Sequence, residues 1–123
     1  MSEENNVDKF GKFLVENLRD KGINHAEFLL NGRWKTPALQ KIQYELNYLS
    51  ISQKDAVKKA IISTIDSAIH DFLFALQEQA DFDNEIQIIV NDDNIVELSD
   101  GIHGEAYSEE GWYAKYSKYE TIE

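Results

Sequence analysis

One histidine lies close to two carboxylates, a combination that could perform acid-base or metal chemistry. His70 follows Asp66 by one helical turn and directly precedes Asp71. On a helix Asp66 and His70 share a face, so the carboxylate would orient the imidazole as a general base or a metal ligand. A metal site needs further ligands, and the chain contains only His25 and His103 besides. We therefore favour pairing or capping within a helix, with catalysis or metal binding as the alternative.

His103 lies in a glycine-containing loop that also holds Ser99 and Asp100. Serine, aspartate and histidine are the residue types of a hydrolytic triad. Triad members, however, are usually brought together by the fold from distant positions, and the chain contains no Gly-x-Ser-x-Gly turn. We interpret the loop as structural, with a contact to a partner and catalysis as the remaining alternatives.

Asp92-Asp93-Asn94 resembles part of a calcium-binding loop but lacks the spaced carboxylates and the terminal glutamate of an EF-hand. A hairpin turn that displays negative charge explains it more simply. The chain contains no cysteine, which excludes disulfides, thiolate nucleophiles and cysteine-ligated metal centres. We expect neither a cofactor nor a metal.

The charge of the chain is divided unevenly. Residues 1–78 contain 11 acidic and 10 basic side chains, whereas residues 79–123 contain 12 acidic side chains and only two lysines. The second segment also contains several large aromatic residues, which are Phe82, Tyr107, Trp112, Tyr113, Tyr116 and Tyr119. A surface that mixes carboxylates with aromatic rings suits a basic protein partner. Because phosphate groups repel such a surface, we expect neither nucleic acid nor anionic membrane as a partner.

The remaining composition indicates one soluble domain over residues 1–123. Hydrophobic residues make up 42% of the chain, which suffices for a core. The first six residues are polar and acidic, unlike a secretory signal, and no apolar run approaches the roughly 18 residues of a membrane span. We expect a cytoplasmic protein of undetermined oligomeric state, and the simplest alternative role for its charge is solubility.

Hydrophobic periodicity predicts helices over about residues 5–21, 36–49 and 52–78, with an ambiguous segment at 23–30. The first helix has an apolar stripe that includes Leu14 and Leu18, and Thr36-Pro37 is a favourable start for the second. Ser52 and Asp55 resemble a capping box at the start of the third. That helix carries apolar residues on two faces, so we expect it to be central and packed on both sides.

The pattern after residue 84 favours strands. Residues 85–98 predict a hairpin around the turn at 91–94, and residues 103–108 and 112–117 predict two further strands. The sequence therefore predicts an α+β domain: about three N-terminal helices in residues 1–78, the last long and central, followed by an antiparallel meander of about four short strands in the acidic residues 79–123.

A basic partner would be recognised mainly by this second part. We expect its carboxylates to steer the partner and its adjacent aromatic residues to anchor it. The candidate steering residues are Asp92, Asp93, Asp100, Glu105, Glu109 and Glu110, and the candidate anchors are Trp112 and Tyr113.

Two segments of the chain stand out together: Ile69-His70-Asp71-Phe72-Leu73-Phe74-Ala75-Leu76-Gln77-Glu78, and the stretch from Val96-Glu97-Leu98-Ser99-Asp100-Gly101 to Gly111-Trp112. They resemble the helix and hairpin of small bacterial proteins, several of which are immunity partners of secreted toxins. The resemblance implies a cytoplasmic antitoxin that covers the basic active-site cleft of a nuclease or similar toxin, and it assigns no site residues. The alternatives are a small metal-binding protein or enzyme that uses His70, Asp66 or His103, and a structural oligomerising subunit built on the two-faced helix.

Overall fold

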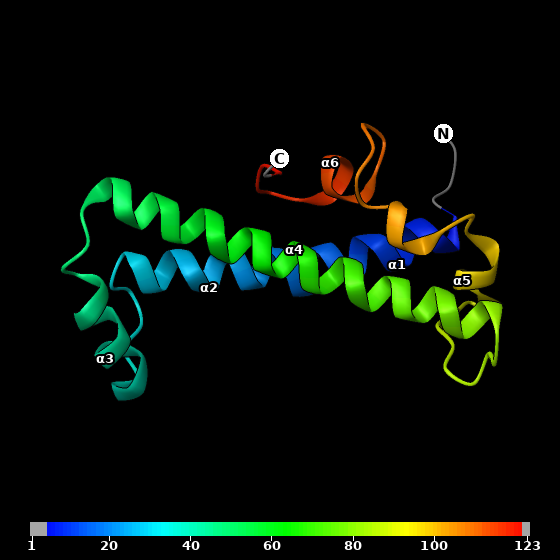
Figure 1. The fold of residues 1–123 in the computed structure, drawn as a ribbon, viewed down its shortest axis with the longest axis horizontal. Coiled ribbons are helices and arrows are strands. Elements are labelled where there is room, and N and C mark those ends of the chain that lie inside the picture. The colour runs from blue at the N-terminus through cyan, green and yellow to red at the C-terminus, as the bar shows by residue number, and fades with distance from the viewer. Residues whose placement is uncertain (1–4, 122–123) are drawn as a thin grey trace.

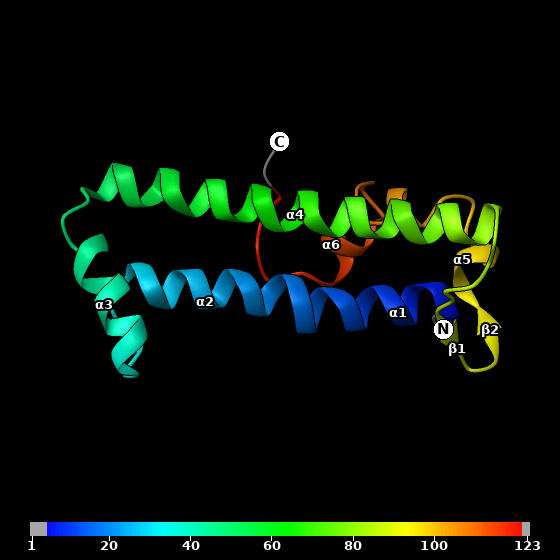
Figure 2. The ribbon, with the colours of Figure 1, turned by 60° about the horizontal axis from the view of Figure 1, so that its bottom comes forward.

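Two long antiparallel helical rods form the frame of the molecule. The computed structural model describes residues 5–121. The first rod runs without a break through α1 (Asn6–Leu14), the π-helical turn η1 (Val15–Arg19) and α2 (Asp20–Leu30). The second rod is α4 (Ile51–Asp81), and α3 (Pro37–Leu46) crosses one end of the pair (Figures 1 and 2). The ambiguous segment 23–30 is thus part of the first rod.

The π-helical turn shifts the buried face of the first rod by one residue. The backbone N–H of Asp20 donates to the carbonyl of Val15, which is the five-residue spacing of a π-helix. As a result Arg19 follows Leu14 on the buried face, and Leu18 is 52% exposed. The predicted apolar stripe is therefore wrong at Leu18. An arginine instead enters the space between the rods.

The long helix α4 begins two residues earlier than the predicted capping box indicates. The Ser50 hydroxyl accepts from the backbone N–H of Gln53, and the Gln53 side chain accepts from the N–H of Ser50. Ser50 and Gln53, rather than Ser52 and Asp55, therefore cap the helix. The second half of α4 contacts α5 and η2, whereas no side chain before Ile62 is buried. The helix is thus central along only part of its length.

The C-terminal part is more helical than the sequence predicts. Its sheet has two strands, β1 (Ile89–Val90) and β2 (Asp93–Asn94), which pair antiparallel. After them the described residues form α5 (Ile95–Leu98), the 3-10 helix η2 (Ile102–Gly104) and α6 (Trp112–Tyr116). The general α+β description agrees with this architecture. The predicted counts, about three N-terminal helices followed by four short strands, are not confirmed: the described residues contain two strands, and short helices replace the other predicted strands.

Neighbouring buried residues explain why the predicted strands are helices. Ile95 and Val96 are both buried, and so are Trp112 and Tyr113. A strand would direct such neighbours to opposite faces, and only one face could meet the core. A helical turn brings both side chains of each pair to the core. The aromatic and β-branched residues that suggest strands are therefore packing residues of short helices.

The core lies between the rods and the C-terminal segment, and Trp112 is its largest fully buried side chain. The indole ring lies directly over Gly11, where an added Cβ would be 2.2 Å from Trp112 Cε2. Phe10 packs edge-on against the same ring, with the centroids 6.0 Å apart. Gly11 therefore makes the close approach of α6 to α1 possible. Within residues 5–121 no helix has the length and apolarity to cross a membrane.

Candidate functional site

Ten of the 23 acidic side chains lie in one segment, residues 81–110, which we call the acidic end. This segment contains no lysine or arginine. It comprises β1, β2, α5, η2 and their loops, and its hairpin lies where α4 ends and α1 begins (Figure 2). Nine of the ten carboxylates are exposed, and Glu105 is half-buried. The six carboxylates that the sequence singles out therefore lie in one region.

The hairpin holds Asp92 and Asp93 at the surface. Asn91 and Asp92 form its two-residue loop, with φ angles of 48° and 71°. Positive φ at both positions is typical of a type I′ turn, which asparagine and aspartate favour. Asn6 donates to Asp93 Oδ2 at 2.6 Å and accepts from the Asn91 amide at 3.0 Å. The start of α1 thus fixes the hairpin and its carboxylates.

Glu105, Glu109 and Glu110 line a cavity of about 570 Å³ beside α1. Asp8 and Lys115 also line it, and they form an ion pair of 3.0 Å. Burial and the negative charge of Asp8 raise the pKa of Glu105. Burial is the larger cause and the charge of Asp8 the second, so a cationic group entering the cavity would favour the ionised form of Glu105.

Asp100 borders a second cavity, of about 490 Å³, between the end of α4 and α5. Asp81 and Glu97 line the same cavity. All three of these residues are exposed. The predicted steering residue Asp100 thus belongs to a further group of carboxylates, which the fold assembles from residues distant in the sequence.

The predicted anchors are not at the surface. Trp112 is fully buried and Tyr113 is 2% exposed, so the prediction that they contact a partner is wrong for this structure. Their burial follows from α6, which turns both rings into the core. The acidic end instead exposes four other large apolar side chains, which are Phe82 (81%), Ile86 (60%), Ile89 (54%) and Leu98 (58%).

The sequence contains a pattern that could have identified three of these exposed apolar residues. Phe82, Ile86 and Leu98 each directly follow an acidic residue. An apolar side chain beside a carboxylate, outside the periodic core pattern of a long helix, is a candidate for a surface contact. The acidic end therefore combines charge with apolar area, although the apolar residues differ from those expected.

The fold brings His70 and His103 together, with ring centroids 5.6 Å apart. Phe74 and Tyr107 lie against the same pair. Asp66 does not orient His70, because its carboxylate accepts two hydrogen bonds from Arg19. Among residues 5–121 there is no group of three or more histidine and carboxylate side chains that could hold a metal ion. His70 Nδ1 lies 3.4 Å from Asp71 Oδ1 on the same helix, and the ring contacts of His70 and His103 are aromatic packing.

Arg19 connects both rods to the end of the described chain. It is fully buried and pairs with Asp66 of α4 at 2.6 Å. Its guanidinium also donates to the Ser117 hydroxyl and to the Glu120 carbonyl, and it lies over the Tyr113 ring. Burial alone would lower the pKa of Arg19, but the hydrogen bond and charge of Asp66 outweigh burial and raise it. Arg19 therefore stays charged as the centre of a structural network.

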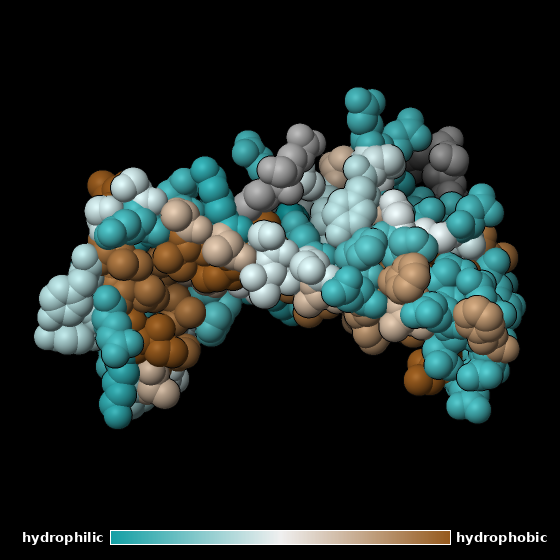
Figure 3. Space-filling model, in the orientation of Figure 1, coloured by the Kyte–Doolittle hydropathy of each residue, from teal (hydrophilic) through white to brown (hydrophobic). Residues whose placement is uncertain are grey.

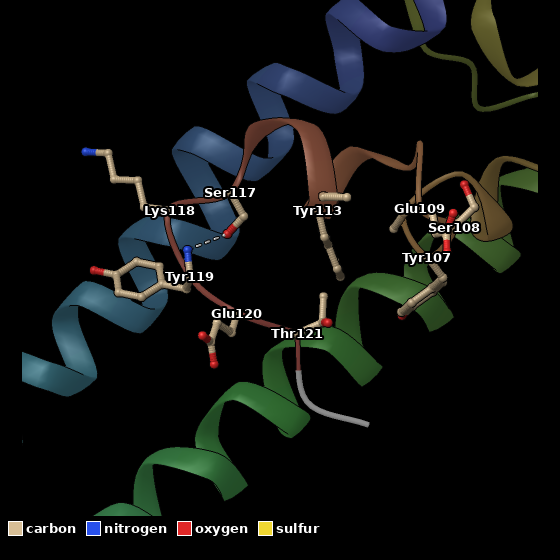
Figure 4. Close-up of a pocket in the computed structure, with 11 residues that line it drawn as sticks. Tyr107, Ser108, Glu109, Tyr113, Ser117, Lys118, Tyr119, Glu120 and Thr121 are labelled. Carbon is tan, nitrogen blue, oxygen red and sulfur yellow. Dashed lines mark hydrogen bonds between the residues drawn. The ribbon is translucent and has the colours of Figure 1, made fainter.

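Residues 117–121, which we call the C-terminal strap, cross the two rods beside a cavity of about 620 Å³ (Figure 4). Tyr107 and Tyr113 form one side of this cavity, and the strap forms the other. Asp20 accepts from the Ser117 hydroxyl at 2.6 Å and from the backbone N–H of Lys118 at 2.9 Å. Burial and the charge of Asp66 raise the pKa of Tyr113. These polar groups hold the strap in place, so we assign the cavity a structural role.

Comparison with models of known protein families, with curated proteins and with solved structures gives no match for this chain.

Proposed function

We propose that this chain is a non-catalytic binding protein that inhibits a basic protein by covering its cationic surface. The observation that carries the proposal is the acidic end, a segment that contains ten carboxylates, no lysine or arginine of its own and four exposed large apolar side chains. Carboxylates attract a cationic partner over a distance, and desolvated apolar side chains retain it after contact. Charges that would speed association and apolar side chains that would slow dissociation therefore occur in the same segment.

A toxin with nuclease activity is the partner class that suits this surface best. A nuclease must present lysine and arginine to the phosphates of its substrate, and the same residues would attract the acidic end. Occlusion of that cleft would need no reaction and no cofactor. The role is that of an immunity protein, which would act in the cytoplasm of the cell that makes the toxin.

The apolar contacts are assigned to Phe82, Ile86 and Leu98 in place of Trp112 and Tyr113. Phe82 is 81% exposed although it is one of the largest side chains of the acidic end. Contact with a partner would remove this apolar area from water, at roughly 25 cal/mol for each Å² buried. The carboxylates around it would form the polar rim of the interface.

Affinity capture with a matched pair of variants tests the proposal. The first variant neutralises four exposed carboxylates of the acidic end, Asp83→Asn, Asp92→Asn, Asp100→Asn and Glu110→Gln. The control variant makes the same change in charge elsewhere, at the exposed residues Glu16→Gln, Glu45→Gln, Asp55→Asn and Asp71→Asn. The immobilised wild-type chain would be presented with lysate of its native host and with the product of the neighbouring gene.

We expect the wild-type chain and the control variant to retain a basic protein whose activity is lost on binding, and the first variant to retain much less. Equal capture by the two variants would show that net charge, not the acidic end, governs binding. Capture of a protein that stays fully active would contradict inhibition by occlusion.

A further inference from the structure

The apolar face of α3 is only partly covered: Leu39 and Leu46 are half-buried, and Ile42 is exposed. The only buried residue of this helix is Gln43. Its side chain accepts from the backbone N–H of Trp34 at 2.8 Å and donates to the carbonyl of Trp34 at 3.0 Å. A polar side chain therefore holds α3 to the preceding loop, while the apolar stripe that should stabilise an amphipathic helix remains partly in solvent.

This partly covered face continues onto the start of α4. The large apolar side chains exposed there are Ile42 (44%), Tyr44 (66%), Tyr48 (76%) and Ile51 (90%). Figure 3 shows a continuous apolar patch over α3 and the adjoining ends of the rods, whereas the opposite end is mostly hydrophilic with separate apolar side chains. A contiguous exposed apolar patch marks an interaction surface in a folded protein.

The charge around this patch is the reverse of the charge at the acidic end. Residues 33–59, which we call the basic end, contain six basic and two acidic side chains. The basic residues are Arg33, Lys35, Lys41, Lys54, Lys58 and Lys59. The acidic end lies at the other end of the rods (Figure 1). The molecule is thus a rod with opposite charges and exposed apolar side chains at its two ends.

We propose that the occupant of the basic end is the acidic end of a second copy, in an antiparallel dimer. Each copy would place its Ile51 region on the exposed Leu98 and Phe82 region of the other, so that both ends of both chains are covered. A two-fold axis makes the two contacts identical and closes the assembly. Pairing of two basic ends is disfavoured by repulsion between their lysines.

In such a dimer, two equivalent contacts would together have to bury the area that a stable interface requires. A specific interface buries about 800 Å² on each partner. The contacts at the two ends would share this area, and both combine apolar side chains with opposite charges. The dimer uses the acidic end that the proposed function assigns to a basic partner, so the second copy and the partner would compete. The dimer itself is tested without any partner.

The first measurement is sedimentation equilibrium of the full chain. We expect a dimer at low ionic strength, with a dissociation constant that rises by about tenfold or more at high salt as the charges are screened. A monomer at both ionic strengths overturns the proposal. This outcome would leave inhibition of a basic partner intact, because that role needs only one acidic end.

A mixing experiment identifies which surfaces meet. Ile51→Glu alters the basic end and Leu98→Lys alters the acidic end, and both positions are exposed, so the fold should be retained and can be checked by circular dichroism. Each variant alone should be a monomer, because every contact needs one intact end of each kind. A mixture of the two variants should form a weaker dimer, because one of its two contacts has both ends intact.

The control is Phe72→Glu, which places the same charge on the exposed face of α4 between the two ends. We expect it to remain dimeric. A Leu98→Lys variant that still forms a homodimer would show that the dimer does not need the acidic end and would overturn the antiparallel arrangement. Loss of the dimer in Phe72→Glu would place the interface on the middle of α4, away from both ends, and overturn it as well.

Discussion

Arg19 and Asp66 form a bidentate ion pair between the first rod and α4. Arg19 Nε donates to Asp66 Oδ1 at 2.6 Å, and Nη2 donates to Oδ2 at 3.1 Å. The planar guanidinium matches the carboxylate, so both hydrogen bonds are made at once. The π-helical turn places Arg19 in this position. The ion pair therefore joins the rods at the place where the C-terminal strap crosses them.

Removal of one partner of this buried pair should be costly. Asp66→Asn leaves the Arg19 charge poorly compensated, and we expect the free energy of unfolding to fall by about 3–5 kcal/mol. Urea denaturation would measure the change. The control is Asp71→Asn on the same helix, which is exposed and should change stability by no more than about 0.5 kcal/mol. Similar small losses in both variants would show that the pair contributes little.

The packing of the Trp112 ring against Gly11 can be tested by a substitution at Gly11. Gly11→Ala places a methyl group against the indole ring, and the required shift of α6 should cost about 1–3 kcal/mol. The near-ultraviolet circular dichroism of the tryptophans should change with it. Gly104→Ala is the matched control, because its Cβ would meet nothing within 4 Å. Unchanged stability and spectrum in Gly11→Ala would contradict the packing of α6 on α1.

The raised pKa of Glu105 predicts that the stability of the folded chain depends on pH. Because burial and Asp8 raise its pKa in the folded state, the folded chain binds this proton more tightly than the unfolded chain. Its contribution to stability is thus most favourable at low pH and falls as the pH rises from the ordinary pKa of glutamate through the raised value. Glu105→Gln should therefore raise the melting temperature at pH 7 and lose this advantage below about pH 4.

Glu109→Gln is the control for this experiment, since Glu109 is exposed on the same cavity. We expect Glu109→Gln to raise the melting temperature at pH 7 by less than Glu105→Gln does. An equal gain would indicate that only the net charge of the chain matters. A loss of stability in Glu105→Gln at pH 7 would contradict the unfavourable ionisation of Glu105.

Exposed apolar side chains of the acidic end should control the lifetime of the complex with a captured basic partner. Phe82→Ser removes an anchor, and we expect dissociation to accelerate by about tenfold or more with little change in association. Surface plasmon resonance separates the two rates. Phe13→Ser is the matched control, because Phe13 is 67% exposed on α1 outside the acidic end. Equal dissociation rates for the two variants would exclude Phe82 as an anchor.

The sequence predicts the long helices because their apolar residues recur over many turns. The prediction is wrong at Leu18, where one extra residue in the π-helical turn rotates the buried face of the helix. The spacing of the apolar residues does not indicate where a π-helical hydrogen bond forms. The prediction also fails after residue 94, where segments of four or five residues are too short to distinguish a strand from a single helical turn. Tertiary burial of Ile95 with Val96, and of Trp112 with Tyr113, decides those segments.

The candidate site is predictable in its charge but not in its apolar contacts. The uneven distribution of acidic residues is visible in the sequence, and the fold keeps the six chosen carboxylates in one region. Trp112 attracts attention as a surface anchor because tryptophan is common at interfaces. Its burial depends on the absence of a side chain at Gly11, a relationship between residues 101 positions apart that no local pattern reveals.

The association rate with the captured basic partner, measured by stopped flow at several salt concentrations, tests the central claim most directly. Between about 10 mM and 150 mM salt the Debye length falls from roughly 30 Å to 8 Å. We predict that the association rate falls by about tenfold or more over this range. The variant with neutralised Asp83, Asp92, Asp100 and Glu110 should lose most of this dependence. An association rate that is the same at both salt concentrations would contradict steering by the acidic end.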